Sequence, residues 1–323
     1  MKLVPIALFV LLLAAPAGAD GYRWVKGNTH AHTRNSDGNE TPRRVMRWYL
    51  DHEYQFLVIS DHDVVTDVTY LDSDRNDDFI LIPGLEITRA QDRLRLHVNA
   101  LNPKRAVPTA ALGRTAAETL QNSVDAALAA GALPQVNHPH WRWSITADDL
   151  LALRGVRLFE LLNVNRDSNN FAAGGRPGTE ELWDSLLSRG MVLYGVASDD
   201  THDYLGDFTL GLAYPGKGWV MVRVTELTAD AVCAALQQGD FYASTGVELA
   251  DVQISDKEYR LAIKPLGDTT YTTRFIGRNG AVLKEDFSLT PAYAFRGDEA
   301  YVRAKVVSSA GELAFCQPAF VRK

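Results

Sequence analysis

Histidines and carboxylates occur together in short motifs that are spread along this chain. The chain of 323 residues has eight histidines, and all except His52 lie in such motifs. In chain order the motifs are His30-Ala31-His32, Ser36-Asp37-Gly38, Ser60-Asp61-His62-Asp63, Gly84-Leu85-Glu86, His97-Val98-Asn99, Asn137-His138-Pro139-His140 and Ser198-Asp199-Asp200-Thr201-His202. Neutral imidazole and ionised carboxylate are common ligands of Zn, Mn and Fe. The fold must therefore bring distant segments to one pocket, which predicts a metalloenzyme with more than one metal.

Short apolar runs alternate with helical segments between about residues 22 and 198. Runs of strand length occupy 55–60, 79–82, 94–101, 133–136, 156–162 and 191–197. Helix starts are indicated by Thr41-Pro42, Thr115-x-x-Glu118, Thr146-x-x-Asp149 and Thr179, since threonine caps helices and proline suits the first turn. This alternation is typical of parallel strands in an α/β barrel or doubly wound sheet.

Most motifs directly follow one of these runs. Asp61 and His62 follow 55–60, Glu86 follows 79–83, His138 follows 133–136, and Asp200 follows 191–197. The carboxyl ends of parallel barrel strands form one face, where active sites assemble. We therefore expect these side chains to lie together on that face.

The pattern changes at about residue 247. Alternating runs at 259–263, 272–276 and 301–307 are separated by turn signals such as Asn279-Gly280 and Ala310-Gly311. They predict a small antiparallel β module resembling an immunoglobulin-like sandwich. The expected organisation is a signal peptide at 1–19, a barrel at 20–246 and the β module at 247–323.

The first 19 residues have the pattern of a secretory signal. Lys2 precedes an apolar stretch at 6–15, and Ala17-Gly18-Ala19 fits the small-x-small cleavage rule. We expect an exported protein, periplasmic or secreted, with no stable membrane insertion after cleavage. The two cysteines, Cys233 and Cys316, exclude a disulfide-rich scaffold, although a single bridge stays open. A net charge of −7 argues against nonspecific nucleic-acid binding.

The spacing within the motifs has consequences for metal binding. His30 and His32 are two residues apart and share one side of an extended chain, so both can bind one metal. Glu86 offers a carboxylate able to bridge two ions, and Asp200-x-His202 repeats the two-residue spacing. Asp37 lies in a glycine-containing turn that can bend back over the site.

The ordered motifs H-x-H, S-D-G, S-D-H, G-x-E, a lone His, H-P and D-x-H resemble those of the PHP (polymerase and histidinol phosphatase) superfamily over most of residues 24–245. The N-terminal signal, the segment Phe241-Tyr-Ala-Ser-Thr-Gly246 and the β module look most like its CehA/McbA-type metallohydrolases. The resemblance implies a distorted (β/α)₇ barrel, followed here by the β-sandwich module, with two or three divalent ions (Zn, Mn or Fe). It assigns His30, His32 and Asp200 to the first metal, Glu86 as the bridge, His97 and His138 to the second, and Asp37, His62 and His202 to the third.

The resemblance also implies chemistry at the site: a multinuclear metal-activated hydroxide that attacks a small phosphate ester. Asp61 or His202 is a candidate for protonating the leaving group, although Asp61 can equally be a helix N-cap. Arg142 and Arg166 are candidate phosphate clamps or plain surface arginines. Glu160 is either a partner for an imidazole N–H or part of a buried ion pair.

Two other functions stay open at this stage. The same site can cleave a carbamate or carboxylic ester, for which Trp141, Trp143 and Tyr204 are candidates for an aromatic slot. A metal-stabilised binding protein without turnover is the third reading. The two hydrolases would take a small anionic or ester substrate, whereas the binding protein would use the β module to bind a carbohydrate or a peptide.

Overall fold

The computed structural model describes residues 21–74, 77–204 and 214–321. The expected signal peptide at 1–19 lies outside these residues. Within them, we find no helix with the length and apolar character needed to cross a membrane. Cys233 and Cys316 are both free thiols, so the bridge that the sequence left open is not formed.

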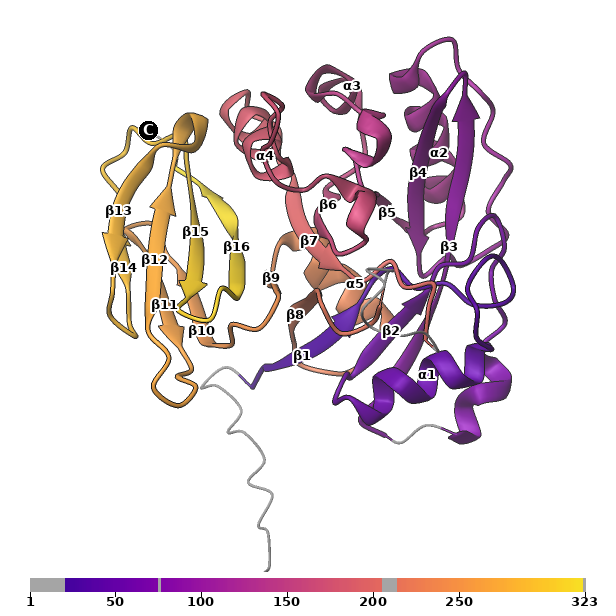
Figure 1. Cartoon of the computed structure of the whole chain (residues 1–323), viewed down its shortest axis with the longest axis horizontal. Helices are drawn as coiled ribbons and strands as arrows, with labels where there is room; N and C mark the ends of the chain where they lie inside the picture. The colour runs from indigo at the N-terminus through magenta and orange to yellow at the C-terminus, as the bar shows by residue number, and fades with distance from the viewer. Residues whose placement is uncertain (1–20, 75–76, 205–213, 322–323) are drawn as a thin grey trace, which may run out of the picture.

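A seven-stranded barrel carries the histidine motifs (Figure 1). Its strands, in hydrogen-bonded order, are β1 (Arg23–Asn28), β2 (Phe56–Ile59), β3 (Ile80–Gln91), β4 (Leu94–Leu101), β5 (Leu133–Val136), β6 (Leu158–Asn163) and β7 (Tyr194–Ser198). The two ends of the series meet just beyond β7 and β1, where Ala31 and Thr201 form a parallel bridge. The expected α/β fold is confirmed.

Helices pack on the outside of these strands, and local sequence explains where they begin. They are α1 (Pro42–Asp51), α2 (Ala116–Ala129), α3 (Ala147–Ala152), α4 (Thr179–Ser188) and α5 (Ala229–Gln238), with 3₁₀ turns η1 (Thr69–Asp74), η2 (Trp141–Trp143), η3 (Arg166–Ser168) and η4 (Arg278–Gly280). The Thr115 hydroxyl accepts from Glu118 N at 3.1 Å at the start of α2. Thr146 and Asp149 form a reciprocal capping box on α3.

The strand β4 departs from the expected parallel arrangement, because it pairs antiparallel with both β3 and β5. A turn at Asp92, with a left-handed φ of 54°, joins β3 directly to β4 with no helix between them. Glu86 and His97 consequently lie inside strands, which corrects the expectation that Glu86 follows one. The hairpin pairs Glu86 with Asn99 and Thr88 with His97, so these four side chains share one face.

The rest of the chain forms two antiparallel sheets. The remaining strands are β8 (Trp219–Val224), β9 (Phe241–Ser244), β10 (Leu249–Ile254), β11 (Glu258–Ile263), β12 (Tyr271–Ile276), β13 (Val282–Asp286), β14 (Ala292–Ala294), β15 (Tyr301–Ser308) and β16 (Leu313–Phe320). Strands β10, β11 and β14 form the first sheet, and β12, β13, β15 and β16 belong to the second. The two sheets pack against each other around a core that contains Tyr259 and Phe275. Because β16 pairs with β9, and β9 with β8, the second sheet is continuous with the barrel. The domain boundary near residue 246 stays a prediction.

A buried ion pair joins the module to helix α4. The Arg303 side chain is 1% exposed, and its Nε and Nη2 donate to Asp184 at 2.7 and 2.6 Å. The Tyr301 hydroxyl donates to the same carboxylate at 2.8 Å. Arg303 Nη2 also lies 3.0 Å from Glu180 Oε1, so removing Asp184 would leave the buried guanidinium with this second carboxylate alone, and removing a partner of a buried charge is costly.

Candidate metal centre

His30, His32 and Asp200 meet where β1 and β7 end. The Nε2 atoms of the two histidines lie 3.0 Å apart, and each lies 3.1 Å from Asp200 Oδ1. All three side chains are buried. Asp200 N donates to His30 O at 3.0 Å, and His32 N donates to Thr201 O at 2.9 Å. These backbone bonds hold the two motifs in register, so their imidazole and carboxylate atoms converge.

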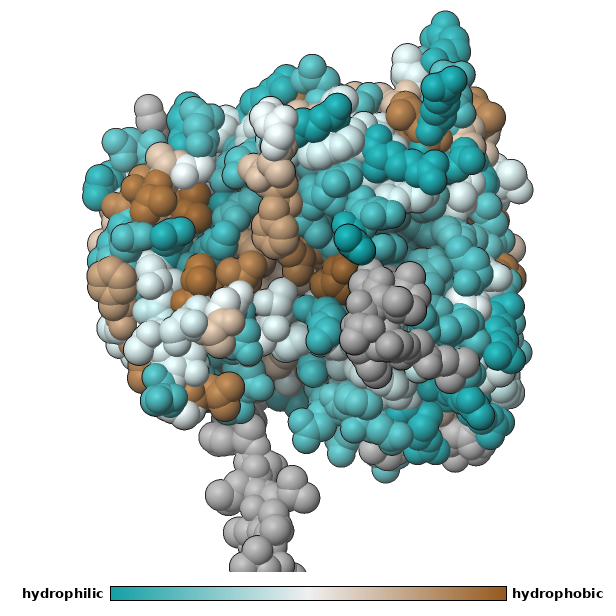
Figure 2. All heavy atoms as spheres, viewed as in Figure 1, coloured by the Kyte–Doolittle hydropathy of each residue, from teal (hydrophilic) through white to brown (hydrophobic). Residues whose placement is uncertain are grey.

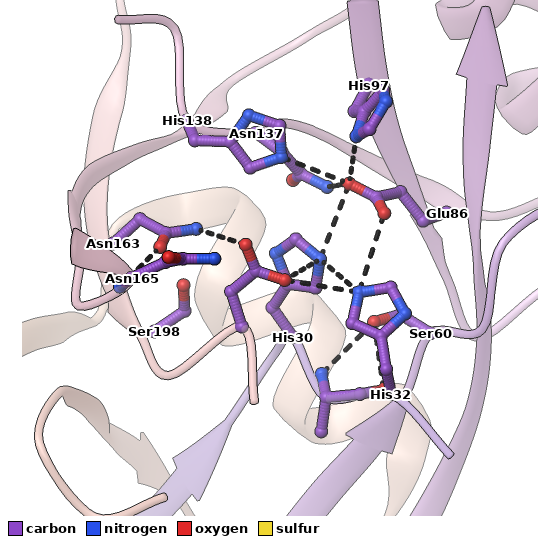
Figure 3. Close-up of polar contacts among 12 residues, drawn as sticks. His30, His32, Ser60, Glu86, His97, Asn137, His138, Asn163, Asn165 and Ser198 are labelled. Atoms are coloured by element: carbon purple, nitrogen blue, oxygen red, sulfur yellow. Dashed lines mark hydrogen bonds and ion pairs between the residues drawn. The ribbon is translucent and has the colours of Figure 1, made fainter. Parts of the chain in front are cut away.

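Glu86 lies at the centre of the histidines, and Figure 3 shows His30 and His32 on one side of it and His97 and His138 on the other. Its carboxylate contacts five imidazoles: Oε1 lies 2.9 Å from His97 Nδ1, 3.3 Å from His138 Nε2 and 3.4 Å from His30 Nε2, and Oε2 lies 2.9 Å from His62 Nδ1 and 3.5 Å from His32 Nε2. Burial works against ionisation, but His97 and His30 hold the pKa of Glu86 well below its usual range. A central carboxylate in this state is suited to bridging cations.

Asp37 completes a third group at the mouth of the site. Its Oδ2 lies 3.3 Å from His62 Nε2, and its Oδ1 lies 3.3 Å from His202 Nε2. The turn approaches the end of β1 so closely that a Cβ on Gly38 would lie 2.7 Å from the backbone of His32. Glycine at this position therefore allows Asp37 to bend back over the histidines.

Three groups of side chains have ligand atoms within 4.8 Å of one another: His30, His32 and Asp200; His62, Glu86 and His97; and His32, Asp37, His62 and His202. These groups contain eight of the nine residues expected to bind metal. The ninth, His138, contacts Glu86, so the structure brings all nine together. The second group differs from the expected one because His62 takes the place of His138. The role of each residue as a ligand stays a prediction.

The donor atoms fit divalent cations. His30 Nδ1 lies 2.6 Å from Glu160 Oε1, so in a neutral ring the Nδ1 hydrogen points to Glu160 and the Nε2 lone pair points to His32 and Asp200. A lone pair beside a carboxylate oxygen is repulsive unless a proton or a cation lies between them. In addition, the buried His97 Nε2 has no hydrogen-bond partner among the described residues.

Two asparagines support the candidate ligands, and the sequence analysis missed both. Asn163 Nδ2 donates to Glu160 Oε2 at 2.8 Å and to Asp200 Oδ2 at 3.0 Å. Asn137 Nδ2 donates to Glu86 Oε1 at 2.7 Å. Each asparagine ends or directly follows a barrel strand, and that position was a signal available in the sequence. Glu160 satisfies both readings offered for it, because it accepts from an imidazole and is fully buried.

Asp61 organises the loop that carries Asp37. Its Oδ1 accepts from Thr33 N and Ser36 Oγ at 2.7 Å each, and its Oδ2 accepts from the hydroxyls of Thr33 and Thr66. A bridge and a turn follow Asp61 rather than a helix, so the N-cap reading is wrong. The proton-donor role of Asp61 stays a prediction, and these contacts support a positioning role.

The adjacent residues Asp199 and Asp200 have different contacts. Asp199 is buried and accepts from the backbone N–H groups of Gly216, Lys217 and Gly218 at 2.8 to 3.0 Å. It thereby anchors the segment that leads into β8. Burial raises the pKa of Asp199 to about 6. Asp200 faces His30 and His32, as the D-x-H spacing indicated.

His62 and His202 both hold protons tightly in the metal-free protein. Burial opposes a charged imidazole, but Asp37 and Glu86 raise the pKa of His62 to about 10. Asp37 and Asp200 likewise raise the pKa of His202 to about 9. The His202 Nδ1 lies 2.8 Å from Asp200 O, so its Nε2 is the atom that faces Asp37.

Metal binding is expected to release protons and to weaken as the pH falls. Between pH 6.5 and 9 the raised pKa values keep His62 and His202 protonated until a cation displaces the protons. Lowering the pH therefore favours the metal-free form, by about tenfold in affinity per pH unit for each proton displaced. Calorimetric titration with Mn²⁺ in two buffers of different ionisation enthalpy measures the proton release. A pH-independent affinity would contradict the prediction.

The pocket above these groups is small, with a volume of about 130 Å³. Its lining consists of Asp37, His62, Glu86, His97, His138, Trp141, Asn165, Asp200 and His202. The Trp141 ring packs 5.4 Å from His97 and 5.3 Å from His138. Trp141 is thus the member of the expected aromatic slot that reaches the pocket.

Other expected substrate-binding residues lie outside this lining. Arg142 is exposed, and its guanidinium lies 4.9 Å above the Trp141 ring. Arg166 is exposed and lines a neighbouring cavity. Trp143 packs against His140 at 4.8 Å, and Tyr204 packs against Tyr49 at 6.5 Å. The phosphate-clamp roles of both arginines stay predictions.

Solved structures with a similar fold exist. A two-domain protein from Bacteroides vulgatus containing a predicted PHP-like metal-dependent phosphoesterase is 19% identical, with a TM-score of 0.53 over 89% of this chain and 91% of its own. An amidohydrolase from Chromobacterium violaceum (14% identity, 58% of this chain and 90% of its own) and the lesion-specific endonuclease EndoQ from Pyrococcus furiosus (12%, 67% and 56%) have TM-scores of only 0.40 and 0.41. No family model and no curated protein matches the chain. The first similarity establishes a shared fold.

Proposed function

We propose that this chain is a metal-dependent hydrolase of the PHP superfamily that cleaves a small phosphate ester. One observation carries the proposal: three overlapping groups of imidazole and carboxylate atoms, joined through the buried Glu86, face one pocket. The shared fold with a protein described as containing a predicted PHP-like metal-dependent phosphoesterase supports it. The resemblance to CehA/McbA-type enzymes, and export from the cell, are part of the same proposal.

The chain's own residues hold and orient the reacting groups. His30, His32 and Asp200 would hold one cation, and Glu86 would be shared with a second. Divalent cations at such a site activate water and polarise the ester. Glu160 fixes the ring of His30, and Asn163 fixes both Glu160 and Asp200. Pre-organised ligands of this kind reduce the reorganisation needed during catalysis.

A phosphoryl group suits the size and charge of the pocket. The volume of about 130 Å³ is well below the several hundred Å³ of pockets that enclose whole organic ligands, and it suits a phosphoryl group. Three divalent cations would carry six positive charges and outweigh the four carboxylates Asp37, Glu86, Asp200 and Glu160, the last of which lies against His30, because neutral imidazoles add no charge. The pocket then attracts an anion although the chain is acidic overall.

Cleavage of a carbamate or carboxylic ester at the same site is the second candidate. Trp141 favours it, because this ring forms an apolar wall of the pocket beside His97 and His138. A planar aryl or acyl group can pack on such a surface. The two candidates share the metal ligands and differ in the bond that is cleaved.

A panel of p-nitrophenyl substrates tests the proposal. The mature protein is expected to hydrolyse p-nitrophenyl phosphate faster than the acetate or carbamate, to lose activity with a chelator and to regain it with Mn²⁺ or Zn²⁺. Faster cleavage of the carbamate would favour the second candidate. Turnover that survives exhaustive metal removal would reject both, and stoichiometric metal without any turnover would favour a binding protein.

A further inference from the structure

The metal pocket is too small to enclose a whole organic substrate. Ligand pockets for whole organic molecules usually enclose several hundred Å³, whereas this one has about 130 Å³. If the reacting group occupies it, the remaining part of the molecule must lie along an adjoining surface.

Such a surface begins at Asn165, which lines both the metal pocket and a second cavity of about 450 Å³. We call this second cavity the junction groove. Its lining includes Asn165, Arg166, Asn170, Phe171, Thr245 and Leu313. One wall thus comes from the loop after β6, and the other comes from Thr245 after β9 and from the start of β16. Figure 2 shows apolar surface between the module and the barrel on this face.

The loop after β6, which forms one wall of the groove, is connected to a candidate metal ligand by hydrogen bonds. Asn163, whose amide donates to Asp200, accepts from Asn165 N and Ser168 Oγ at 2.9 Å each. Asn170 Nδ2 donates to Asn163 O at 2.7 Å, which closes the loop. A group lying in the groove is therefore held at a defined place relative to Asp200.

The junction groove offers both an apolar side chain and polar side chains to a ligand. Phe171 is 67% exposed and offers an aromatic face on which an apolar group in the groove can pack. The Arg166 guanidinium and the Asn165 side-chain amide have no hydrogen-bond partner within the described residues, and Arg166 is exposed. The groove therefore offers an apolar contact surface with a cation and an amide beside it.

We propose that the junction groove binds the organic group of the substrate, and that this group has an aromatic or similarly apolar body with an anionic substituent. The inference rests on the proposed function and specifies its substrate class. The body packs on Phe171, the anion pairs with Arg166, and Asn165 marks the passage to the metal pocket. The β module has a role in this arrangement, since Leu313 and Thr245 form the opposite wall.

Non-hydrolysable phosphonates test the groove by binding rather than by turnover. Calorimetry on the metal-loaded mature protein is done with methylphosphonate, benzylphosphonate and 4-carboxybenzylphosphonate. The benzyl compound is expected to bind about tenfold more tightly than the methyl compound, and the carboxylate to add up to about fivefold.

Substitutions identify the contacts. Phe171→Ala is expected to weaken benzylphosphonate binding by about fivefold to tenfold. Arg166→Gln is expected to remove the advantage of the carboxylate; an equal loss of methylphosphonate affinity would assign Arg166 to the phosphoryl group and overturn its role in this proposal. Matched controls are Phe287→Ala, at a phenylalanine 72% exposed on the module, and Arg105→Gln, at an exposed arginine; both should match the unmodified protein.

The outcomes separate the two proposals. Metal-dependent binding of all three phosphonates with equal affinity would overturn the groove and leave the proposed function standing. If Phe171→Ala left the affinity difference between benzylphosphonate and methylphosphonate unchanged, the groove proposal would also be overturned. Failure of methylphosphonate to bind the metal-loaded protein would overturn the proposed phosphoesterase function, and the groove proposal with it.

Discussion

Glu86→Ala is expected to lower kcat/KM by at least about 100-fold and to reduce the number of bound metals. The side chain is 1% exposed and contacts five histidines from different segments. Loss of an outer-shell partner alone typically costs about 10- to 100-fold, and Glu86 is placed to contact the cations themselves. Metal content by atomic emission and rates with p-nitrophenyl phosphate measure the two effects.

Two further variants make the result specific. Glu86→Gln keeps the size of the side chain and one acceptor oxygen while removing the charge, so reduced metal binding there assigns the effect to the charge. Glu226→Ala changes an exposed glutamate before α5 and should leave metal content and rate unaltered. A folded Glu86→Ala protein with normal metal content and rate would refute the bridging role.

Asp184→Ala is expected to lower the free energy of unfolding by about 3 kcal/mol, the lower end of the range for a broken buried ion pair, because Glu180 stays 3.0 Å from Arg303 Nη2. The substitution leaves the Arg303 guanidinium, 1% exposed, without two hydrogen bonds of 2.7 and 2.6 Å. The buried Tyr301 hydroxyl loses its acceptor as well. Urea denaturation followed by circular dichroism measures the change.

The matched control is Asp148→Ala. Asp148 pairs with Arg189 at 2.8 Å, but its side chain is 85% exposed, so the expected cost is at most about 1 kcal/mol. The double variant Asp184→Leu with Arg303→Met removes both charges and should recover most of the loss. Equal effects of Asp184→Ala and Asp148→Ala would mean that the buried pair does not hold the module to the barrel.

Ending the chain near residue 246 would be a poor test of whether the module contributes to the metal site. The hydrophobic cluster around Phe159 and Trp183 in the barrel also includes Tyr301 and Phe315 from the module. Truncation would expose that cluster as well as the edge of β9, so a failure to fold would not reveal where metal binds.

Local chemistry made the helices and several strands predictable. Threonine side chains cap α1, α2 and α3 as expected, because a hydroxyl at that position satisfies free backbone N–H groups. Thr179 does not cap α4: it is the first residue of that helix, and the N-cap is Gly178. The strands β4 and β5 have the expected bounds, since apolar residues recur along each segment over the length of a strand. The convergence of the histidine motifs also followed from sequence, because metal-binding side chains have to meet.

Strand direction and side-chain orientation depended on tertiary structure. Glu86 reaches the centre from inside β3 because β4 folds back as a hairpin partner, and no local residue pattern distinguished that hairpin from a parallel crossover. Arg142 follows a candidate ligand closely in sequence, but its left-handed φ of 53° belongs to a turn in which the side chain is exposed.

The sequence by itself determined which chemical groups are available and roughly where strands and helices form, since both depend on neighbouring residues. Only the tertiary structure decided which atoms face each other: Asp61 towards Thr33, His62 towards Glu86, and Arg166 into a groove shared with the module. The reason is physical. A contact between residues far apart in the chain depends on the packing of every element between them, which no short motif encodes.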